Sequence, residues 1–229
     1  MDSIATIATI LRHAIPIASM DDVKTDAFAK IPTTHIDTIL YHTNAYTSFI
    51  LSIGALLQCK DIVKEKNLKI IGIDYNEYYV QAAKNSIQEQ DMQDSISVHA
   101  MSIYDEQALA KVVASTPKQE VDTVYFSGSF SLMPDPKGAL AAVLKVLKKP
   151  DGEICITQTY QKKYDPIMSR VKPLIKFVTT IDFGQLVTVE DIAELLNNVD
   201  DLKVKEHGVM QGSIDNYWQA AYLSILVRK

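Results

Sequence analysis

Asp74 ends a short apolar run and is the residue best placed to bind a polar ligand. The run from Leu68 to Asp74 reads Leu-Lys-Ile-Ile-Gly-Ile-Asp, and a helix-forming stretch from Tyr78 to Gln88 follows it. Such a run is typical of a buried parallel strand. A carboxylate at its end could accept hydrogen bonds from both ribose hydroxyls of a nucleotide, as in doubly wound α/β domains. An Asp before a helix could equally serve only as its N-cap, so this run alone leaves both roles open.

Five further residues at the ends of expected strands are candidates for binding the same ligand: Tyr75, Ser102, Ile103, Ser127 and Gly128. The first is an aromatic directly after the carboxylate; it could cover a base or simply lie on the surface. The hydroxyl of Ser102 and the backbone N–H of Ile103 follow the alternating run Ser95–Ala100, and could read the edge of a base or make ordinary strand-end contacts. Gly128 follows the run Val121–Phe126, where a residue without Cβ allows a close approach of the backbone. A plain turn is the alternative there.

The sequence does not single out a catalytic base. Four residues are candidates if the N-terminal residues form a lid over the site: His42, Tyr46, Tyr160 and His207. General-base catalysis needs a group of suitable pKa within hydrogen-bond reach of the reacting proton. A reaction of an already activated group can instead depend mainly on positioning. A lone histidine is more often structural, so none of the four is assigned the role.

The composition is that of an ordinary globular protein. The chain has 229 residues, of which 47% are hydrophobic and 22% charged, which suits one domain with a small appendage. The formal net charge of −5 argues against a dedicated nucleic-acid surface. Cys59 and Cys155 form no metal-ligand or disulfide pattern. We therefore expect neither a bound metal nor a nucleic-acid partner.

The start of the chain does not have the pattern of a targeting segment. The stretch from Met1 to Met20 is apolar, but it lacks a basic beginning and carries Arg12 and His13. No run reaches the ~20 apolar residues that a membrane span requires. Few cysteines fit a reducing compartment. These observations predict a cytoplasmic protein with no membrane partner, and they leave the oligomeric state open.

Expected strands and helices alternate along most of the chain, which predicts a doubly wound α/β fold with a mostly parallel sheet. Phe49–Gly54 is the expected first strand. The stretches Leu202–Gly208 and Ala220–Arg228 follow each other without a helix, which predicts a closing antiparallel hairpin. We expect a seven-stranded, Rossmann-like domain over residues 47–229, with an N-terminal helical cap over residues 1–46.

Three blocks of the chain resemble the class I S-adenosylmethionine-dependent methyltransferases. The segment IIGIDYNEYYVQAAKNSI is similar to the family's second-strand motif, whose acid binds the cofactor's ribose, and VHAMSIYD is similar to the third-strand motif beside the adenine. The block from Val121 to Tyr160 resembles the fourth strand, the next helix and the fifth strand, with Asp122 and Asp135-Pro136 at family positions. The resemblance covers roughly residues 47 to 229. It implies S-adenosylmethionine as cofactor, bound by Gly54, Asp74, Tyr75, Ser102, Ile103, Ser127 and Gly128.

The chain departs from this family at the glycine-rich loop that follows the first strand and admits the cofactor's methionine end. The corresponding stretch keeps one glycine, Gly54, and any Cβ at such a position would hold the cofactor away. In one interpretation Phe49–Gly54 remains a strand and its glycine forms a tight turn. In the other, Thr47–Lys66 is one continuous helix and the loop is lost. Ser102 also stands where the family often has Asp, which Asp105 could replace.

We therefore expect an S-adenosylmethionine-dependent methyltransferase that acts on a small molecule. The N-terminal residues and the insert Gln161–Gly184 would enclose the substrate. The loop after the fourth strand lacks the Asn/Asp-Pro-Pro-aromatic tetrapeptide with which this family methylates planar amino groups in nucleic acids or glutamine. Two alternatives remain: a catalytically inactive binding or scaffold protein of the same fold, and a different nucleotide-binding enzyme such as a reductase.

Overall fold

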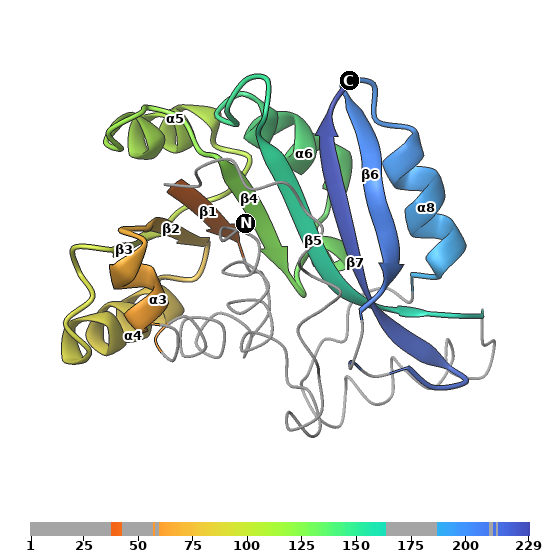
Figure 1. Ribbon diagram of the computed structural model, residues 1–229, viewed down its shortest axis with the longest axis horizontal. Helices are drawn as coiled ribbons and strands as arrows, with labels where there is room; N and C mark the ends of the chain where they lie inside the picture. Colours follow the sequence, from red (N-terminus) through yellow and green to blue (C-terminus); the bar gives the residue numbers. More distant parts are fainter. Residues whose placement is uncertain (1–37, 43–56, 58–59, 164–186, 211–212, 214) are drawn as a thin grey trace.

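A seven-stranded sheet forms the centre of the computed structural model (Figure 1), which describes residues 38–42, 57, 60–163, 187–210, 213 and 215–229. The strands lie in the order β3-β2-β1-β4-β5-β7-β6. Their bounds are β1 (Thr38–His42), β2 (Lys69–Asp74), β3 (Ile96–Ala100), β4 (Thr123–Ser127), β5 (Glu153–Gln161), β6 (Leu202–Val209) and β7 (Gln219–Arg228). The pairs from β3 to β5 are parallel, and β7 is antiparallel to both β5 and β6. The predicted doubly wound fold and its closing hairpin are confirmed.

The central strand is not the one that the sequence predicts. Thr38–His42 pairs in parallel with β2 on one side and β4 on the other, which is the position expected for Phe49–Gly54. Residues 49–54 lie outside the described part of the chain, but the place of the first strand in the sheet is already filled. The α/β domain therefore begins before residue 47, and the expected boundary at residue 46 is wrong. The expected helical cap lies, up to residue 37, outside the described residues.

Helices cover both faces of the sheet. Their bounds are α3 (Lys60–Glu65), α4 (Glu77–Glu89), α5 (Glu106–Ala114), the 3-10 turn η2 (Phe130–Leu132), α6 (Pro136–Leu144) and α8 (Val189–Asn197). Residues of α3 and α4 join one buried cluster, and residues of α5, α6 and α8 join the other. Of the stretch Thr47–Lys66, once considered as one helix, the described part is helical at Leu57 and over α3.

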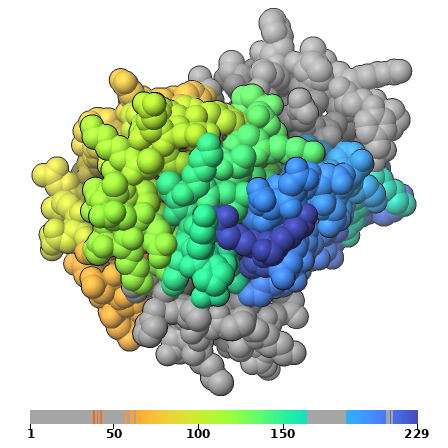
Figure 2. All heavy atoms as spheres, turned by 90° about the horizontal axis from the view of Figure 1, so that it is seen from above, coloured from red at the N-terminus to blue at the C-terminus, as the bar shows by residue number. Residues whose placement is uncertain are grey.

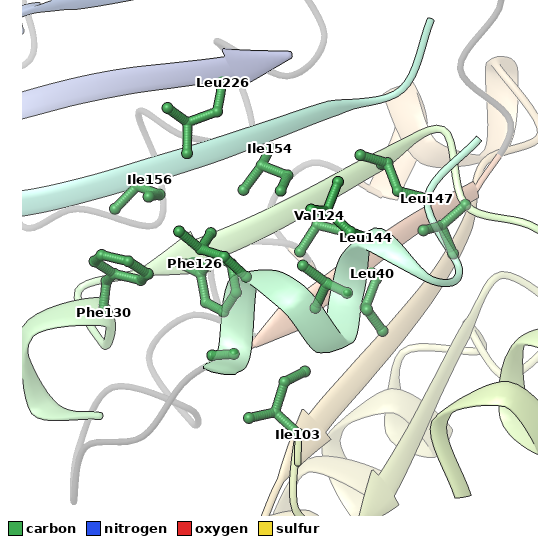
Figure 3. Packing of buried hydrophobic residues seen from close by; sticks show 14 of the residues in the cluster. Leu40, Ile103, Val124, Phe126, Phe130, Leu144, Leu147, Ile154, Ile156 and Leu226 are labelled. Atoms are coloured by element: carbon green, nitrogen blue, oxygen red, sulfur yellow. The ribbon is translucent and has the colours of Figure 1, made fainter. Parts of the chain in front are cut away.

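The core on the α6 side is built from the alternate residues of the central strands. Val124 and Phe126 of β4 and Ile156 of β5 are fully buried, and Figure 3 shows them beneath α6 with Phe130 beside them. The rings of Phe126 and Phe130 meet edge to face, with centroids 5.5 Å apart. Burying each such side chain contributes about 1.5–3 kcal/mol to the free energy of folding. This packing fixes where β4 ends, and hence where the loop after it begins.

Side-chain caps set where three of the helices begin. Asp105 accepts a hydrogen bond from the N–H of Ala108 at the start of α5, and Asp135 accepts one from Gly138 at the start of α6. A Cβ on Gly138 would lie 2.2 Å from the Asp135 carboxylate, so this cap requires glycine there. Thr188, the expected cap of α8, forms a complete capping box with Asp191.

The carboxyl ends of the parallel strands meet at the lower edge of the sheet in Figure 1. Figure 2 looks onto the opposite edge, where α5, the turn before β5 and the ends of β6 and β7 form a continuous surface. In open α/β sheets ligands bind outside the carboxyl ends, at the point where the strand order reverses. Here that point lies between β1 and β4. The residues that end β1, β2, β3 and β4 therefore define the candidate site.

Candidate functional site

Asp74 is the last residue of β2, and its side chain is buried. It is only 1% exposed, and its Oδ1 accepts a hydrogen bond of 2.8 Å from the N–H of Asn76. The N-cap of α4 is Asn76, whose side chain accepts from the N–H of Tyr78. Asp74 is therefore not the cap of the next helix, which removes the structural role that the sequence left open. A buried carboxylate at the end of the second strand can accept hydrogen bonds from a pair of hydroxyls.

Exposed aromatic rings follow Asp74. Tyr75 is 62% exposed and Tyr78 is 74% exposed. The rings of Tyr78 and Tyr79 meet edge to face. A ring as open as that of Tyr75 is available to a ligand held by the neighbouring carboxylate, as the sequence predicts.

The end of β3 holds the next two predicted residues in different settings. Ser102 is exposed, and its Oγ accepts a hydrogen bond of 3.2 Å from the N–H of Tyr104. The side chain of Ile103 is 2% exposed and belongs to the core on the α6 side, so only its backbone could contact a ligand. Asp105, the residue that could replace the acid missing at position 102, has its carboxylate engaged as the cap of α5.

Tyr104 links the loop after β3 to the start of α6. Its hydroxyl donates to the carbonyl oxygen of Asp135 and accepts from the N–H of the same residue, both at 3.1 Å. The tyrosine thereby joins two of the loops that border the candidate site. No sequence pattern marks this contact, because the partner is a backbone group distant in the chain.

The loop after β4 begins with Ser127 and Gly128. Ser127 is 3% exposed. Gly128 has a φ of 62°, and its N–H donates to the carbonyl oxygen of Thr157 in β5 over 2.8 Å. A residue with Cβ would be strained in this conformation. The glycine thus lets the chain leave β4 sharply at the point where the strand order reverses, which agrees with the predicted close approach of the backbone.

His42 ends β1, beside the point of reversal, and contacts the same loop. Its side chain is 4% exposed, and its ring packs against Phe126 with centroids 5.6 Å apart. The hydroxyl of Ser129, which is fully buried, donates to the carbonyl oxygen of His42 over 3.1 Å, and Nδ1 of His42 lies 3.4 Å from the same hydroxyl oxygen. Burial lowers the pKa of His42 to about 3. The imidazole is therefore neutral at physiological pH.

The residues that follow β1 do not include a glycine turn. His42 is succeeded by Thr43, Asn44, Ala45 and Tyr46, and the next glycine in the sequence is Gly54. Gly54 therefore does not directly follow the strand, contrary to the arrangement from which its role was predicted. Gly54 and Tyr46 lie outside the described residues, so any role in ligand binding stays a prediction.

The two other candidate bases lie together on the far half of the sheet. Tyr160 of β5 and His207 of β6 contact the same ring, that of Tyr222, with centroids 5.9 Å and 5.1 Å away. Burial raises the pKa of Tyr160 and lowers that of His207. The hydroxyl of Tyr160 and Nε2 of His207 are buried without a hydrogen-bond partner. A tyrosine with a raised pKa is a poor general base, so this cluster does not supply one.

Two other kinds of site were searched for in the described part of the chain. It contains no group of three or more His, Cys, Asp or Glu side chains arranged to hold a metal ion. Over the same residues, none of the helices has the length and apolar character to cross a membrane.

Comparisons with known proteins bear on this arrangement. Residues 54–221 match the family model described as a methyltransferase domain. The solved structure of the MccD protein has a TM-score of 0.59 at 13% identity, covering 84% of this chain and 90% of that one. A SAM-dependent methyltransferase from Aquifex aeolicus has a TM-score of 0.54 at 14% identity, covering 85% of each chain. A SAM-dependent methyltransferase from Geobacter sulfurreducens, solved with S-adenosyl-L-homocysteine, has a TM-score of 0.53 at 10% identity, covering 86% of each. No curated protein matches the chain.

Proposed function

The chain belongs to the family of methyltransferase domains, and from this premise we propose that it transfers a methyl group from S-adenosylmethionine to a small molecule. The observation that carries the proposal is the buried carboxylate of Asp74 at the end of β2, released from helix capping and next to the point where the strand order reverses. A nucleotide-binding carboxylate is expected at this position in doubly wound sheets.

The described residues fit the nucleoside half of the cofactor. Asp74 would accept from the ribose hydroxyls, Ser102 and the N–H of Ile103 would meet the edge of the adenine, and Tyr75 would cover its face. When bound, the cofactor supplies a methyl group activated by a positively charged sulfur. Gly128, with its positive φ, would let the backbone after β4 approach the region between cofactor and acceptor. These assignments of residues to ligand groups belong to the proposal.

A small acceptor is favoured over a macromolecule by charge and by the loop after β4. The net charge of −5 is unfavourable for binding nucleic acid. The loop reads Ser-Gly-Ser-Phe-Ser-Leu-Met-Pro from Ser127 to Pro134 and lacks the tetrapeptide used on planar amino groups. Without an ionised base in the described site, an acceptor that is already nucleophilic, such as an amine or a thiolate, is the most suitable kind.

A second function is favoured by one observation, the absence of glycine directly after β1. A protein of this fold that binds a partner without catalysis would not need that turn. Isothermal titration with S-adenosylhomocysteine separates the two. We expect binding with a Kd of tens of micromolar, corresponding to about 6 kcal/mol. No binding at millimolar concentration would reject the enzyme and favour the non-catalytic protein.

A further inference from the structure

The sheet order determines which part of the cofactor would reach His42. Asp74 ends β2, and β2 has β3 on one side and β1 on the other. With the ribose at Asp74 and the adenine toward β3, the rest of the cofactor extends toward β1, which lies ~4.8 Å away. His42 ends β1 and is level with Ile73 in the register, one residue before Asp74. Its side chain is thus next along the edge on the amino-acid side of the cofactor.

The contacts of His42 determine where its proton lies. The hydroxyl of Ser129 has one proton, and its shorter contact, 3.1 Å, is to the carbonyl oxygen of His42, which can only accept. At the 3.4 Å contact the same oxygen is therefore the acceptor, and Nδ1 of His42 carries the proton. A neutral imidazole has one N–H, so Nε2 presents a lone pair. Among the described residues, Nε2 has no hydrogen-bond partner.

From this arrangement we infer that Nε2 of His42 accepts a hydrogen bond from the amino group at the amino-acid end of the cofactor. This inference rests on the proposed function. Of the charged groups on that side of the ribose, the ammonium donates hydrogen bonds, the carboxylate only accepts them, and the sulfonium has no N–H or O–H. A lone pair matches the ammonium alone. A charge-assisted hydrogen bond of this kind is strong. It would hold the cofactor where the family's glycine turn is missing.

His42 is then a residue of the binding site and Ser129 a positioning residue. The hydroxyl of Ser129 acts through the imidazole, because it holds the proton on Nδ1 and keeps Nε2 free. The ring is further held by Phe126. A purely structural histidine at this place would fix the loop after β4 to β1 but would not distinguish ligands that differ only in an amino group.

Two ligands test the inference by titration calorimetry: S-adenosylhomocysteine and its deaminated analogue, which keeps the nucleoside, the sulfur and the carboxylate. We expect the wild-type protein to bind the first about tenfold more tightly. His42→Leu should remove this difference by weakening S-adenosylhomocysteine alone. Ser129→Ala should reduce the difference by a few-fold. Equal affinities in the wild type, or equal losses for both ligands in His42→Leu, would overturn the inference.

A spectroscopic measurement on the wild-type protein covers the case in which His42→Leu fails to fold. In a sample with 15N-labelled histidine, the Nε2 resonance of His42 should have the shift of an unprotonated nitrogen. It should move when S-adenosylhomocysteine is added and stay in place with the deaminated analogue. A proton on Nε2 in the free protein, or the same response to both ligands, contradicts the inference. If neither ligand binds the wild type, the proposed function itself fails.

Discussion

The backbone N–H of Thr38 donates a 3.0 Å hydrogen bond to Oδ2 of Asp122, 84 positions away in the sequence. The bond joins the first residue of β1 to the residue before β4. Oδ1 of the same carboxylate accepts from Nζ of Lys148 over 3.1 Å, and Asp122 is only 5% exposed. One buried carboxylate thus ties the beginning of the central strand to its neighbour and to the segment after α6. It aligns the strands whose other ends, His42 and Ser127, border the candidate site.

Replacing Asp122 with alanine should destabilise the fold substantially. The change leaves a buried N–H on Thr38 and the ammonium of Lys148 without this acceptor, and we expect the free energy of unfolding to fall by about 2–4 kcal/mol. Urea denaturation followed by circular dichroism measures the loss. Glu106→Gln is the matched control, because Glu106 pairs with Lys145 on the surface and should change stability by less than about 0.5 kcal/mol. Equal losses in both variants would contradict this role of Asp122.

The identity of the first strand was the one element that the sequence mispredicted, and the reason is physical. Thr38–His42 and Phe49–Gly54 are both short, β-prone and apolar, so local pattern does not separate them. The choice is made by pairing with two other strands and by the bond to Asp122, both of them contacts distant in the sequence. The later elements are longer and carry their own caps, and their boundaries differ from the predicted ones by only a few residues.

The candidate site was predictable to the extent that strand ends define it. Asp74, Ser102 and Ser127 follow directly from the apolar runs that precede them, and the structure brings these strand ends to one edge of the sheet. His42 was named as a candidate base, but its place at the end of β1 depends on the strand that was mispredicted. The contact with Ser129 joins residues 87 positions apart and leaves no mark in the local pattern.

Removing the hydroxyl of Thr188 should weaken the start of α8. Its Oγ1 accepts from the N–H of Asp191 over 3.2 Å, and the Asp191 carboxylate accepts in return from the N–H of Thr188. We expect Thr188→Ala to lower the free energy of unfolding by about 1 kcal/mol. Thr188→Ser keeps the hydroxyl and should restore most of the stability. Thermal unfolding of the three proteins measures the effect, and a serine variant as unstable as the alanine one would argue against the cap.

The buried imidazole of His42 should make stability depend on pH. Its pKa is lowered by burial to about 3 in the folded chain, whereas an exposed imidazole titrates near 6.5. Between these values the unfolded chain binds a proton that the native chain does not, so acid favours unfolding. The contribution is fully present above about pH 6.5 and falls as the pH drops, by up to about 1.4 kcal/mol per unit.

Denaturant unfolding of wild type and His42→Gln between about pH 5 and 7 isolates this term. Burial also lowers the pKa values of His99 and His207, so the wild-type slope alone would mix three groups. The variant should lose part of the slope in this window. An unchanged slope would show that His42 titrates normally in the folded protein. His99→Gln serves as the control, because His99 is less buried and should contribute a smaller part.

Asp74→Asn should weaken binding of S-adenosylhomocysteine while leaving the fold in place. Asparagine can still accept the hydrogen bond from the N–H of Asn76, so the local turn is preserved, but the charge that strengthens hydrogen bonds from a pair of hydroxyls is lost. Such bonds contribute about 1.5–3 kcal/mol, so affinity should fall between tenfold and a few hundredfold.

The matched control for this prediction is Asp105→Asn, because Asp105 is the other carboxylate near the edge and is engaged as the cap of α5. It should bind S-adenosylhomocysteine as the wild type does and lose only a little stability, since asparagine also caps helices well. Titration calorimetry gives the affinities, and circular dichroism reports the fold. If Asp74→Asn is folded and binds with unchanged affinity, Asp74 is not the ribose ligand. If Asp105→Asn alone loses affinity, the acid that holds the nucleoside follows β3 instead of ending β2.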